Sequence, residues 1–290
     1  MSDYYGLPTG LLENETMRLE YLLTAGPRIV RLSFRGGANL LAEVPDIHVE
    51  TPLGPFSFRG GHRLWRSPEL MPETYFPDNH DLGVEDLPDG IKLIQPAKEG
   101  TEISKSMEIR LGVAATMLTI RHELRNEGTS AVVLAPWALT MFRMGGTAIL
   151  PQPSESEESN RLLNNRILAL WPYTRINDPR LILRDDFFMI RAVPDLPPVK
   201  IGYLNPRGWL AYWLDGILFR KTFETHPGAI YPDGGCNSEV YCNDQFIELE
   251  SLGPLSGLEP GQSVSHLETW ELFDRLDQPF LPQEAHALFS

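Results

Sequence analysis

Two glutamates near the C-terminal end of the chain have the spacing that most favours chemistry. Glu248 and Glu250 lie two residues apart in the segment 246–250. Side chains alternate between the two faces of a β-strand, so a strand here places both carboxylates on one face and Ile247 and Leu249 on the other. Carboxylates opposite a buried face need water, cations or a ligand around them. They can also exchange protons with a bound substrate.

The segment before these glutamates adds two further polar side chains. Glu239 and Tyr241 share one face of the segment 236–243 by the same two-residue period. If the two segments pair as adjacent antiparallel strands, we expect both side chains to lie beside the two glutamates in one polar patch. The solvated outer face of a β-sandwich would have the same pattern, so the residues alone leave both interpretations open.

A second candidate segment, 58–80, combines two glycines with a histidine, an arginine and a tryptophan. The glycines let the backbone approach a ligand or another strand closely. His62 supplies a titratable ring, Arg63 a fork of donors and Trp65 a flat apolar face, a combination that suits the hydroxyls and the C–H face of a sugar. The structural alternative is that Trp65 packs in the core, that Arg63 pairs with Glu69, and that His62 is simply hydrogen-bonded inside the protein.

Two lysines lie on predicted strands. Lys221 shares a strand face with Phe219 and Phe223. A lysine between two aromatic side chains either extends to the rim of the sheet or lies in a cleft beside a carboxylate. Lys200 opens its strand, and we expect it to be a solvated strand end.

Strands must position these candidates, because strand-like stretches dominate the chain. Residues 159–170 have the apolar spacing of a short helix, which Ser159 or Asn160 could cap and Trp171 and Pro172 would end. The pattern predicts one antiparallel β domain spanning residues 1–290, with a short helical insertion near its middle. Strands are expected at 17–34, with a turn at 25–27, and at 101–125, 130–143, 181–193, 199–204, 208–214, 217–223, 238–242, 246–252 and 264–272.

Composition and charge exclude several classes of protein. The 290 residues include 25 Lys and Arg against 39 Asp and Glu, a formal net charge of −14, which argues against a nucleic-acid partner. No apolar stretch approaches the roughly 20 residues that cross a membrane, and the N-terminal residues lack the pattern of a signal peptide. Cys236 and Cys242 are expected to be reduced thiols. We therefore expect a cytoplasmic protein, a monomer or homodimer, whose partner is a small molecule.

The common motifs of phosphate, nucleophile and metal sites are missing from the sequence. It contains no Gly-rich phosphate loop, no Gly-x-Ser-x-Gly and no His-Glu-x-x-His. None of the seven histidines lies three or four residues from another. The sequence therefore offers no support for a metal site.

Four segments, spread over nearly the whole chain, share their order and their motifs with a known superfamily. They are 26–41, with Asn-Leu-Leu after its second strand, 60–65 (GGHRLW), 118–143, and 246–263, where a strand-borne glutamate precedes a Leu-x-Pro-Gly turn. Together they resemble the galactose mutarotase-like, or aldose 1-epimerase-like, superfamily. The combination of GGHRLW, YPDGG, SEVY and ELESLGP is most similar to an uncharacterised bacterial branch of it.

This resemblance implies an all-β fold, the β-supersandwich, a large twisted antiparallel double layer with a sugar on its concave face. Members of the superfamily interconvert the α and β anomers of aldoses by ring opening. A base removes the proton of the anomeric hydroxyl while an acid protonates the ring oxygen. No cofactor is required, and the partner is a small-molecule carbohydrate.

The resemblance also assigns site residues by position. Glu250 matches the general base of the superfamily. Leu139 stands where the superfamily has its acid histidine, and leucine cannot donate a proton, so His62 or Lys221 would have to supply the acid. The remaining candidates would bind the sugar's hydroxyls and ring; they are Arg63, Trp65, Glu69, Trp137, Glu239, Tyr241 and Glu248.

Three functions remain open at this point. The first is an aldose 1-epimerase-like isomerase acting on a neutral or amino sugar, since a sugar phosphate needs an arginine cluster and only Arg59, Arg63 and Arg66 lie near one another. The second, suggested by Leu139, is a carbohydrate-binding protein without turnover. The third is a different sugar reaction on the same scaffold.

Overall fold

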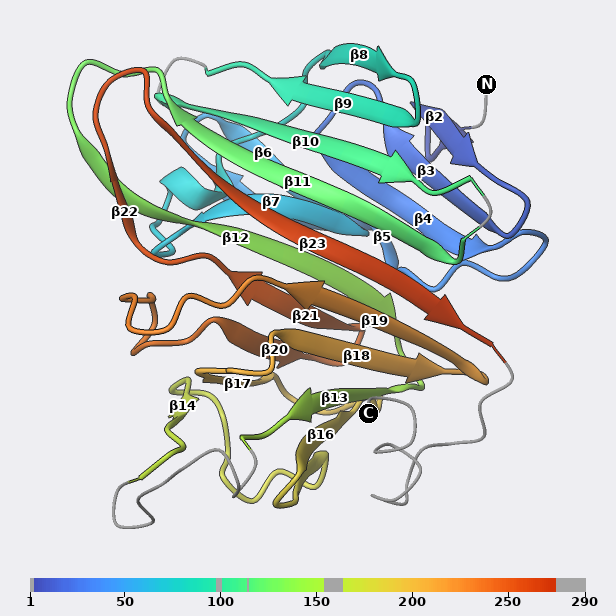
Figure 1. Cartoon of the computed structure of the whole chain (residues 1–290), viewed down its shortest axis with the longest axis vertical. Helices are drawn as coiled ribbons and strands as arrows, with labels where there is room; N and C mark the ends of the chain where they lie inside the picture. Colours follow the sequence, from blue (N-terminus) through green and yellow to red (C-terminus); the bar gives the residue numbers. More distant parts are fainter. Residues whose placement is uncertain (1–2, 98–100, 114, 154–163, 275–290) are drawn as a thin grey trace.

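The computed structural model describes residues 3–97, 101–113, 115–153 and 164–274, which form two large antiparallel sheets. In Figure 1 the ten-stranded sheet crosses the front, and strands of the eleven-stranded sheet lie behind it. The eleven-stranded sheet has the order β1 (Asp3–Tyr4), β2 (Leu7–Glu13), β3 (Met17–Leu22), β4 (Arg28–Phe34), β7 (His62–Ser67), β12 (Val132–Arg143), β21 (Phe246–Leu252), β20 (Ser238–Cys242), β17 (Val199–Tyr203) and β14 (Leu168–Leu170), with β22 (Ser256–Leu258) paired to β12.

The ten-stranded sheet brings together strands that are far apart in the sequence. The last strand, β23, lies between β11 and β19. The order is β15 (Leu181–Leu183), β16 (Phe187–Arg191), β13 (Thr147–Pro151), β18 (Trp209–Leu214), β19 (Ile217–Phe223), β23 (Ser263–Phe273), β11 (Met117–Asn126), β10 (Ile103–Leu111), β9 (Gly90–Gln95) and β8 (Gly83–Leu87). A separate hairpin consists of β5 (Glu43–Thr51) and β6 (Gly54–Gly60), and a single 3-10 turn, η1, covers Glu73–Tyr75.

The main apolar core lies between the two sheets. Ile247 and Leu249 of β21 belong to it together with Ile120 of β11 and Trp270 of β23. Since side chains alternate along β21, its glutamates point to the outer face of the eleven-stranded sheet. This confirms the predicted alternation of the segment 246–250.

The outer face is also covered, which explains why every residue of β21 is buried. Phe56 from the β5–β6 hairpin packs with Trp65 and Trp137 of the sheet. Tyr75 of η1 packs against Trp65 with ring centroids 5.0 Å apart, and Tyr173 packs edge-on against a tyrosine of β20. Polar groups of the outer face are therefore enclosed between the sheet and these aromatic side chains.

The predicted all-β sandwich is confirmed, but the predicted helix is wrong over the part that the structure describes. Residues 159–163 lie outside the described residues, 164–167 have no regular structure, and Leu168–Leu170 form β14. Its backbone pairs with β17, so sheet pairing overrides the helical spacing of the apolar residues. Cys236 and Cys242 are free and buried. Among the described residues, no helix is long and apolar enough to cross a membrane.

Candidate functional site

Strand register brings the sequence-predicted glutamates together. Leu139 of β12 pairs with Arg63 of β7 on one side and with Glu250 of β21 on the other. Glu250 pairs in turn with Glu239 of β20. These four residues form one row across the outer face, and Glu248 belongs to the next row, where it pairs with Tyr241 and Met141. The predicted pairing of the two glutamate-bearing segments is thus confirmed.

A lysine that the sequence analysis assigned to a solvated strand end lies at the centre of this group. Lys200 of β17 is 5% exposed. Its Nζ lies 2.7 Å from Oε2 of Glu239 and 2.9 Å from Oε2 of Glu250. The ammonium also lies over two indole rings, 4.8 Å from the centroid of Trp137 and 4.5 Å from that of Trp171. The assignment of Lys200 was wrong because these contacts come from strand β12 and from a loop.

The two carboxylates around Lys200 keep unused hydrogen-bonding capacity. Glu250 Oε2 accepts a hydrogen bond from Trp137 Nε1 at 2.7 Å as well as the bond from Lys200. Its other oxygen, Oε1, is buried and has no hydrogen-bond partner among the described residues, and the same is true of Glu239 Oε1. Buried oxygens of this kind are rare in proteins and call for a proton, a water molecule or a ligand.

A second ion pair borders this group. Arg63 donates to Oε1 of Glu248 at 2.7 Å, and its guanidinium carbon lies 4.1 Å from the centroid of the Trp65 ring. Glu69 is exposed and accepts a hydrogen bond from the Tyr75 hydroxyl. The alternative pairing of Arg63 with Glu69 is therefore wrong, and Glu69 lies outside the enclosed group.

Burial controls the protonation of these carboxyl groups. It raises the pKa of Glu239 well above the ordinary value, and Lys200 opposes this shift only in part. Burial likewise raises the pKa of Glu248, against the effect of Arg63. Burial alone would lower the pKa of Lys200, but Glu250 and Glu239 outweigh it and raise that pKa. Lys200 is thus a permanent cation, and Glu239 is a carboxyl group able to hold a proton.

We call this enclosed group the outer-face cluster. Its members share the outer face of the eleven-stranded sheet, and Tyr241 is the most exposed of them. Burial raises the pKa of Tyr241 to about 12, so its hydroxyl remains a hydrogen-bond donor. The outer-face cluster consists of Arg63, Trp65, Trp137, Lys200, Glu239, Tyr241, Glu248 and Glu250.

The two residues expected to supply the acid lie on the opposite side of the sheet. His62 alternates with Arg63 along β7 and faces the interior, where its ring packs on Trp270. Lys221 is fully buried and donates to Glu268 Oε1 at 2.9 Å. The sheet itself separates both from Glu250, so neither can protonate a sugar bound beside that residue. The expectation that His62 or Lys221 is the acid partner of Glu250 is wrong.

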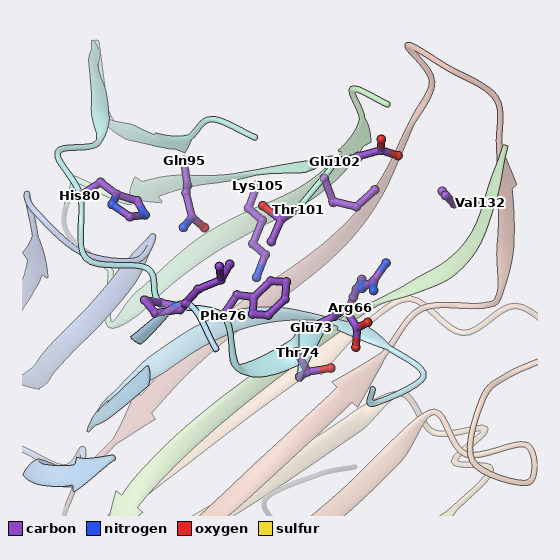
Figure 2. A pocket seen from close by; sticks show the side chains of 13 residues that line it. Arg66, Glu73, Thr74, Phe76, His80, Gln95, Thr101, Glu102, Lys105 and Val132 are labelled. Atoms are coloured by element: carbon purple, nitrogen blue, oxygen red, sulfur yellow. The ribbon is translucent and has the colours of Figure 1, made fainter. Parts of the chain in front are cut away.

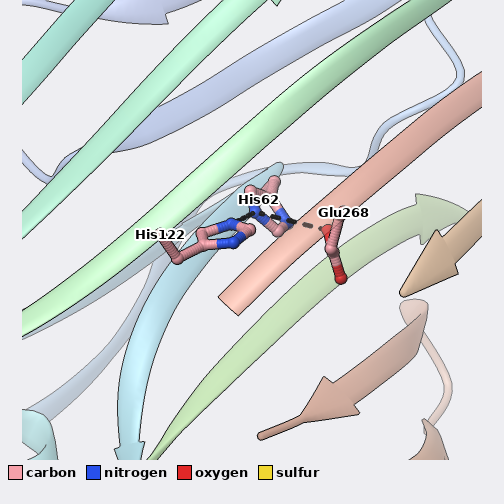
Figure 3. Close-up of side chains that lie close together, drawn as sticks. All are labelled: His62, His122 and Glu268. Atoms are coloured by element: carbon pink, nitrogen blue, oxygen red, sulfur yellow. Dashed lines mark hydrogen bonds and ion pairs between the residues drawn. The ribbon is translucent and has the colours of Figure 1, made fainter. Parts of the chain in front are cut away.

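His62 and Lys221 belong instead to an interior cluster between the sheets. His62 Nε2 lies 2.8 Å from His122 Nε2 and 4.0 Å from Glu268 Oε2 (Figure 3). His266 bonds to Ser251 Oγ at 2.7 Å, and this hydroxyl donates to Glu268. The interior cluster consists of His62, His122, Lys221, Ser251, His266 and Glu268.

The hydrogen bonds of the two paired imidazoles assign their protons. His122 Nδ1 lies 3.0 Å from the carbonyl oxygen of His266, so this nitrogen must carry a proton. Burial lowers the pKa of His122, which makes the ring neutral and its Nε2 an acceptor. His62 Nε2 therefore donates to it, and His62 Nδ1 accepts from the Thr140 hydroxyl at 2.9 Å.

The same residues include a set that could hold a metal ion. Ligand atoms of His62, His122 and Glu268 lie within 4.8 Å of one another. Both Nε2 atoms, however, already bond to each other, and the carboxylate accepts from Lys221 and from the Trp270 indole at 2.8 Å. A divalent cation would also lie beside the Lys221 ammonium. The donor set fits a hydrogen-bonded network better than a metal centre.

Comparisons with known proteins place the fold. No protein-family model matches this chain, and no curated protein sequence does. A galactose mutarotase-like protein from Lactobacillus casei superposes with a TM-score of 0.57 at 11% identity, over 92% of this chain and 100% of that one. An Escherichia coli K12 protein that bears the provisional name aldose 1-epimerase gives 0.55 at 14%, over 93% and 100%. The Slr1438 protein from Synechocystis gives 0.59 at 13%, over 92% and 96%. The chain thus has the galactose mutarotase-like fold that its sequence motifs predicted.

Proposed function

We propose that the protein binds a neutral sugar at the outer-face cluster and interconverts its anomers by general acid–base catalysis. One observation carries this proposal: Glu239 and Glu250 share Lys200, and each keeps a buried Oε1 that bonds to nothing in the part of the chain that the structure describes. Two carboxyl groups with different environments can serve as a proton donor and a proton acceptor. The mutarotase-like fold supports the choice of a sugar as substrate.

Glu250 is the proposed base. Lys200 and Trp137 both donate to its Oε2, and its Oε1 has no hydrogen-bond partner among the described residues. Oε1 then accepts the proton of the anomeric hydroxyl. Glu239, whose pKa is raised by burial, is the proposed acid and gives its proton to the ring oxygen. This role replaces the one that His62 and Lys221 were expected to play.

The proton transfers balance in both directions. Loss of the hydroxyl proton to Glu250 forms the carbonyl at C1 as the bond from C1 to the ring oxygen breaks, and Glu239 protonates that oxygen. Rotation about the C1–C2 bond exposes the other face of the aldehyde. Ring closure then returns one proton to Glu239 and one to the new anomeric hydroxyl. The protein and the sugar exchange only protons, so the reaction needs no cofactor.

The charges of the cluster favour a neutral substrate. Arg63 is paired with Glu248, and Lys200 is paired with both other glutamates. A sugar phosphate would therefore find no free cation in the outer-face cluster.

The test is NMR of the anomeric protons of freshly dissolved α-glucose and α-galactose, with and without the protein. We expect acceleration that falls by a factor of roughly 10² to 10⁴ in Glu250→Gln and in Glu239→Gln. The matched control is Glu85→Gln, an exposed glutamate of β8. Equal acceleration by the wild type and Glu250→Gln would contradict the assigned base, and tighter binding of hexose 6-phosphates than of hexoses would contradict the substrate class.

Binding without turnover is the second candidate, and Leu139 favours it. This apolar side chain lies between Arg63 and Glu250 in the row that crosses the outer face. If no aldose is accelerated while a sugar raises the melting temperature of the protein, the binding function replaces the catalytic one.

A further inference from the structure

A cavity of about 450 Å³ shares no lining residue with either polar cluster. Its walls come from β7 of one sheet, from β9 and β10 of the other, and from the segment around η1 (Figure 2). Arg66 lines it, whereas Arg63 and Trp65 of the same strand point to the outer face. A volume of this size can enclose a small organic molecule.

Two cations extend into this cavity, and the one carboxylate that acts on the charge of Lys105, Asp78, is shared with other cations. The Lys105 side chain hangs from β10 toward Phe76, and Arg66 reaches in from β7 (Figure 2). Neither side chain makes a hydrogen bond or a close ion pair with a described residue. The nearest buried carboxylate, Asp78, is already bound by Arg28 at 2.9 Å and Arg59 at 3.0 Å. In a chain of net charge −14, two half-buried cations left together mark a place for an anion.

The rest of the lining defines the shape of the missing partner. Gln95 and Thr101 offer neutral hydrogen-bonding groups, and Phe76 and Ile103 offer apolar surface. Glu73 and Glu102 also line the cavity, but both residues are exposed, so solvent screens their charges. The half-buried part of the cavity is therefore positive at its polar end and apolar elsewhere.

We propose that this cavity binds a small organic anion, a carboxylate or phosphate group on a mainly apolar body, with the anionic group held by Arg66 and Lys105. The protonation of Lys105 supports this assignment. Burial lowers the pKa of Lys105 to about 8, and the neighbouring Arg66 adds to the shift while Asp78 opposes it. A bound anion would stabilise the ammonium form. The site is independent of the proposed sugar chemistry.

The test compares three ligands that share one apolar body. Benzoate and phenyl phosphate carry the two anionic groups, and benzyl alcohol carries none. We expect calorimetry to detect at least one of the anions at millimolar concentration, and benzyl alcohol to bind at least about tenfold more weakly. Inorganic phosphate and acetate report how much the anionic group contributes alone. Equal affinity for benzyl alcohol, or no binding of either anion, would overturn the proposal.

Two variants locate the binding site. Arg66→Gln and Lys105→Gln should each lower the affinity for the anion by about tenfold or more. Lys92→Gln removes the same charge from β9 outside the cavity and should leave the affinity within about twofold. Unchanged affinity in both cavity variants would overturn the proposal. Because a variant could fold poorly, acetylation of the wild type at pH 8 gives a second readout: the anion should protect Lys105 and leave Lys92 reactive.

Discussion

The outer-face cluster and the interior cluster occupy opposite faces of the same strands, yet their polar groups are used differently. In the interior cluster, each side chain has a hydrogen-bond partner, and Glu268 alone accepts from Lys221, Ser251 and Trp270. In the outer-face cluster, both oxygens of Glu239 and one of Glu250 have no hydrogen-bond partner among the described residues, and Glu239 Oε2 has only its ion pair with Lys200. Burial alone therefore does not distinguish a site from a structural network.

The two clusters differ in whether donors and acceptors remain free to bond to a ligand. A fully bonded network stabilises one arrangement and leaves no donor or acceptor for a substrate. A buried oxygen without a hydrogen-bond partner costs free energy, and a ligand that donates a hydrogen bond to it removes that cost. We therefore assign the chemistry to the outer face and a structural role to the interior, and three substitutions test this assignment.

The largest effect is expected from Glu268→Gln. This change leaves the Lys221 ammonium buried without its carboxylate, so the free energy of unfolding should fall by about 3–5 kcal/mol. Urea denaturation at pH 7 measures the change. A loss below about 1 kcal/mol would show that the interior network contributes little to stability.

The next effect concerns pH and the interior histidines. Burial lowers the pKa of His266 to about 3, whereas the unfolded chain has the ordinary value of 6.5. Around and below pH 6.5 the unfolded state therefore binds more protons than the folded state. The free energy of unfolding falls as the pH falls. Compared with His266→Gln, the wild type should lose about 2 kcal/mol more between pH 6.5 and 5. Parallel stability curves for the two proteins would contradict this.

The smallest effect is expected from Glu239→Gln in the outer-face cluster. Its Oε1 has no hydrogen-bond partner within the described ranges, and Lys200 keeps Glu250 as its counter-ion. At pH 5 the free energy of unfolding should therefore change by less than about 1 kcal/mol. The pH trend has the opposite sign to that of His266. The raised pKa of Glu239 makes the folded wild type bind more protons, so its stability is lost as pH rises, and the variant should gain on it between pH 5 and 8. A variant whose stability falls relative to that of the wild type between pH 5 and 8 would contradict the assignment.

Local periodicity predicted much of this arrangement. The two-residue alternation of strands put Glu248 and Glu250 on one face, and it separated Arg63 from His62. It also put Lys221 on one strand face with two phenylalanines. It left open whether this lysine extends to the rim or lies beside a carboxylate, and the bond to Glu268 shows the second. These features depend only on neighbours within one strand or on one pair of adjacent strands.

Features that depend on distant parts of the chain could not be predicted. Lys200 is buried because Trp171 of a loop and Trp137 of β12 enclose its ammonium. His62 and His122 are 60 residues apart and meet only across the gap between the two sheets. No pattern within a window of the sequence contains the register and the layer spacing that bring such residues together.

The short η1 turn has one further consequence. Tyr75 faces the outer-face cluster and packs on Trp65, whereas its neighbours Thr74 and Phe76 line the cavity on the other side. Residues 74–76 thus separate the outer-face cluster from the cavity. A mutation here affects both the packing on Trp65 and the lining of the cavity. We therefore expect these residues to vary less in evolution than those of an ordinary surface turn. A substitution in this turn that is designed to change the cavity will also change the packing above the outer-face cluster.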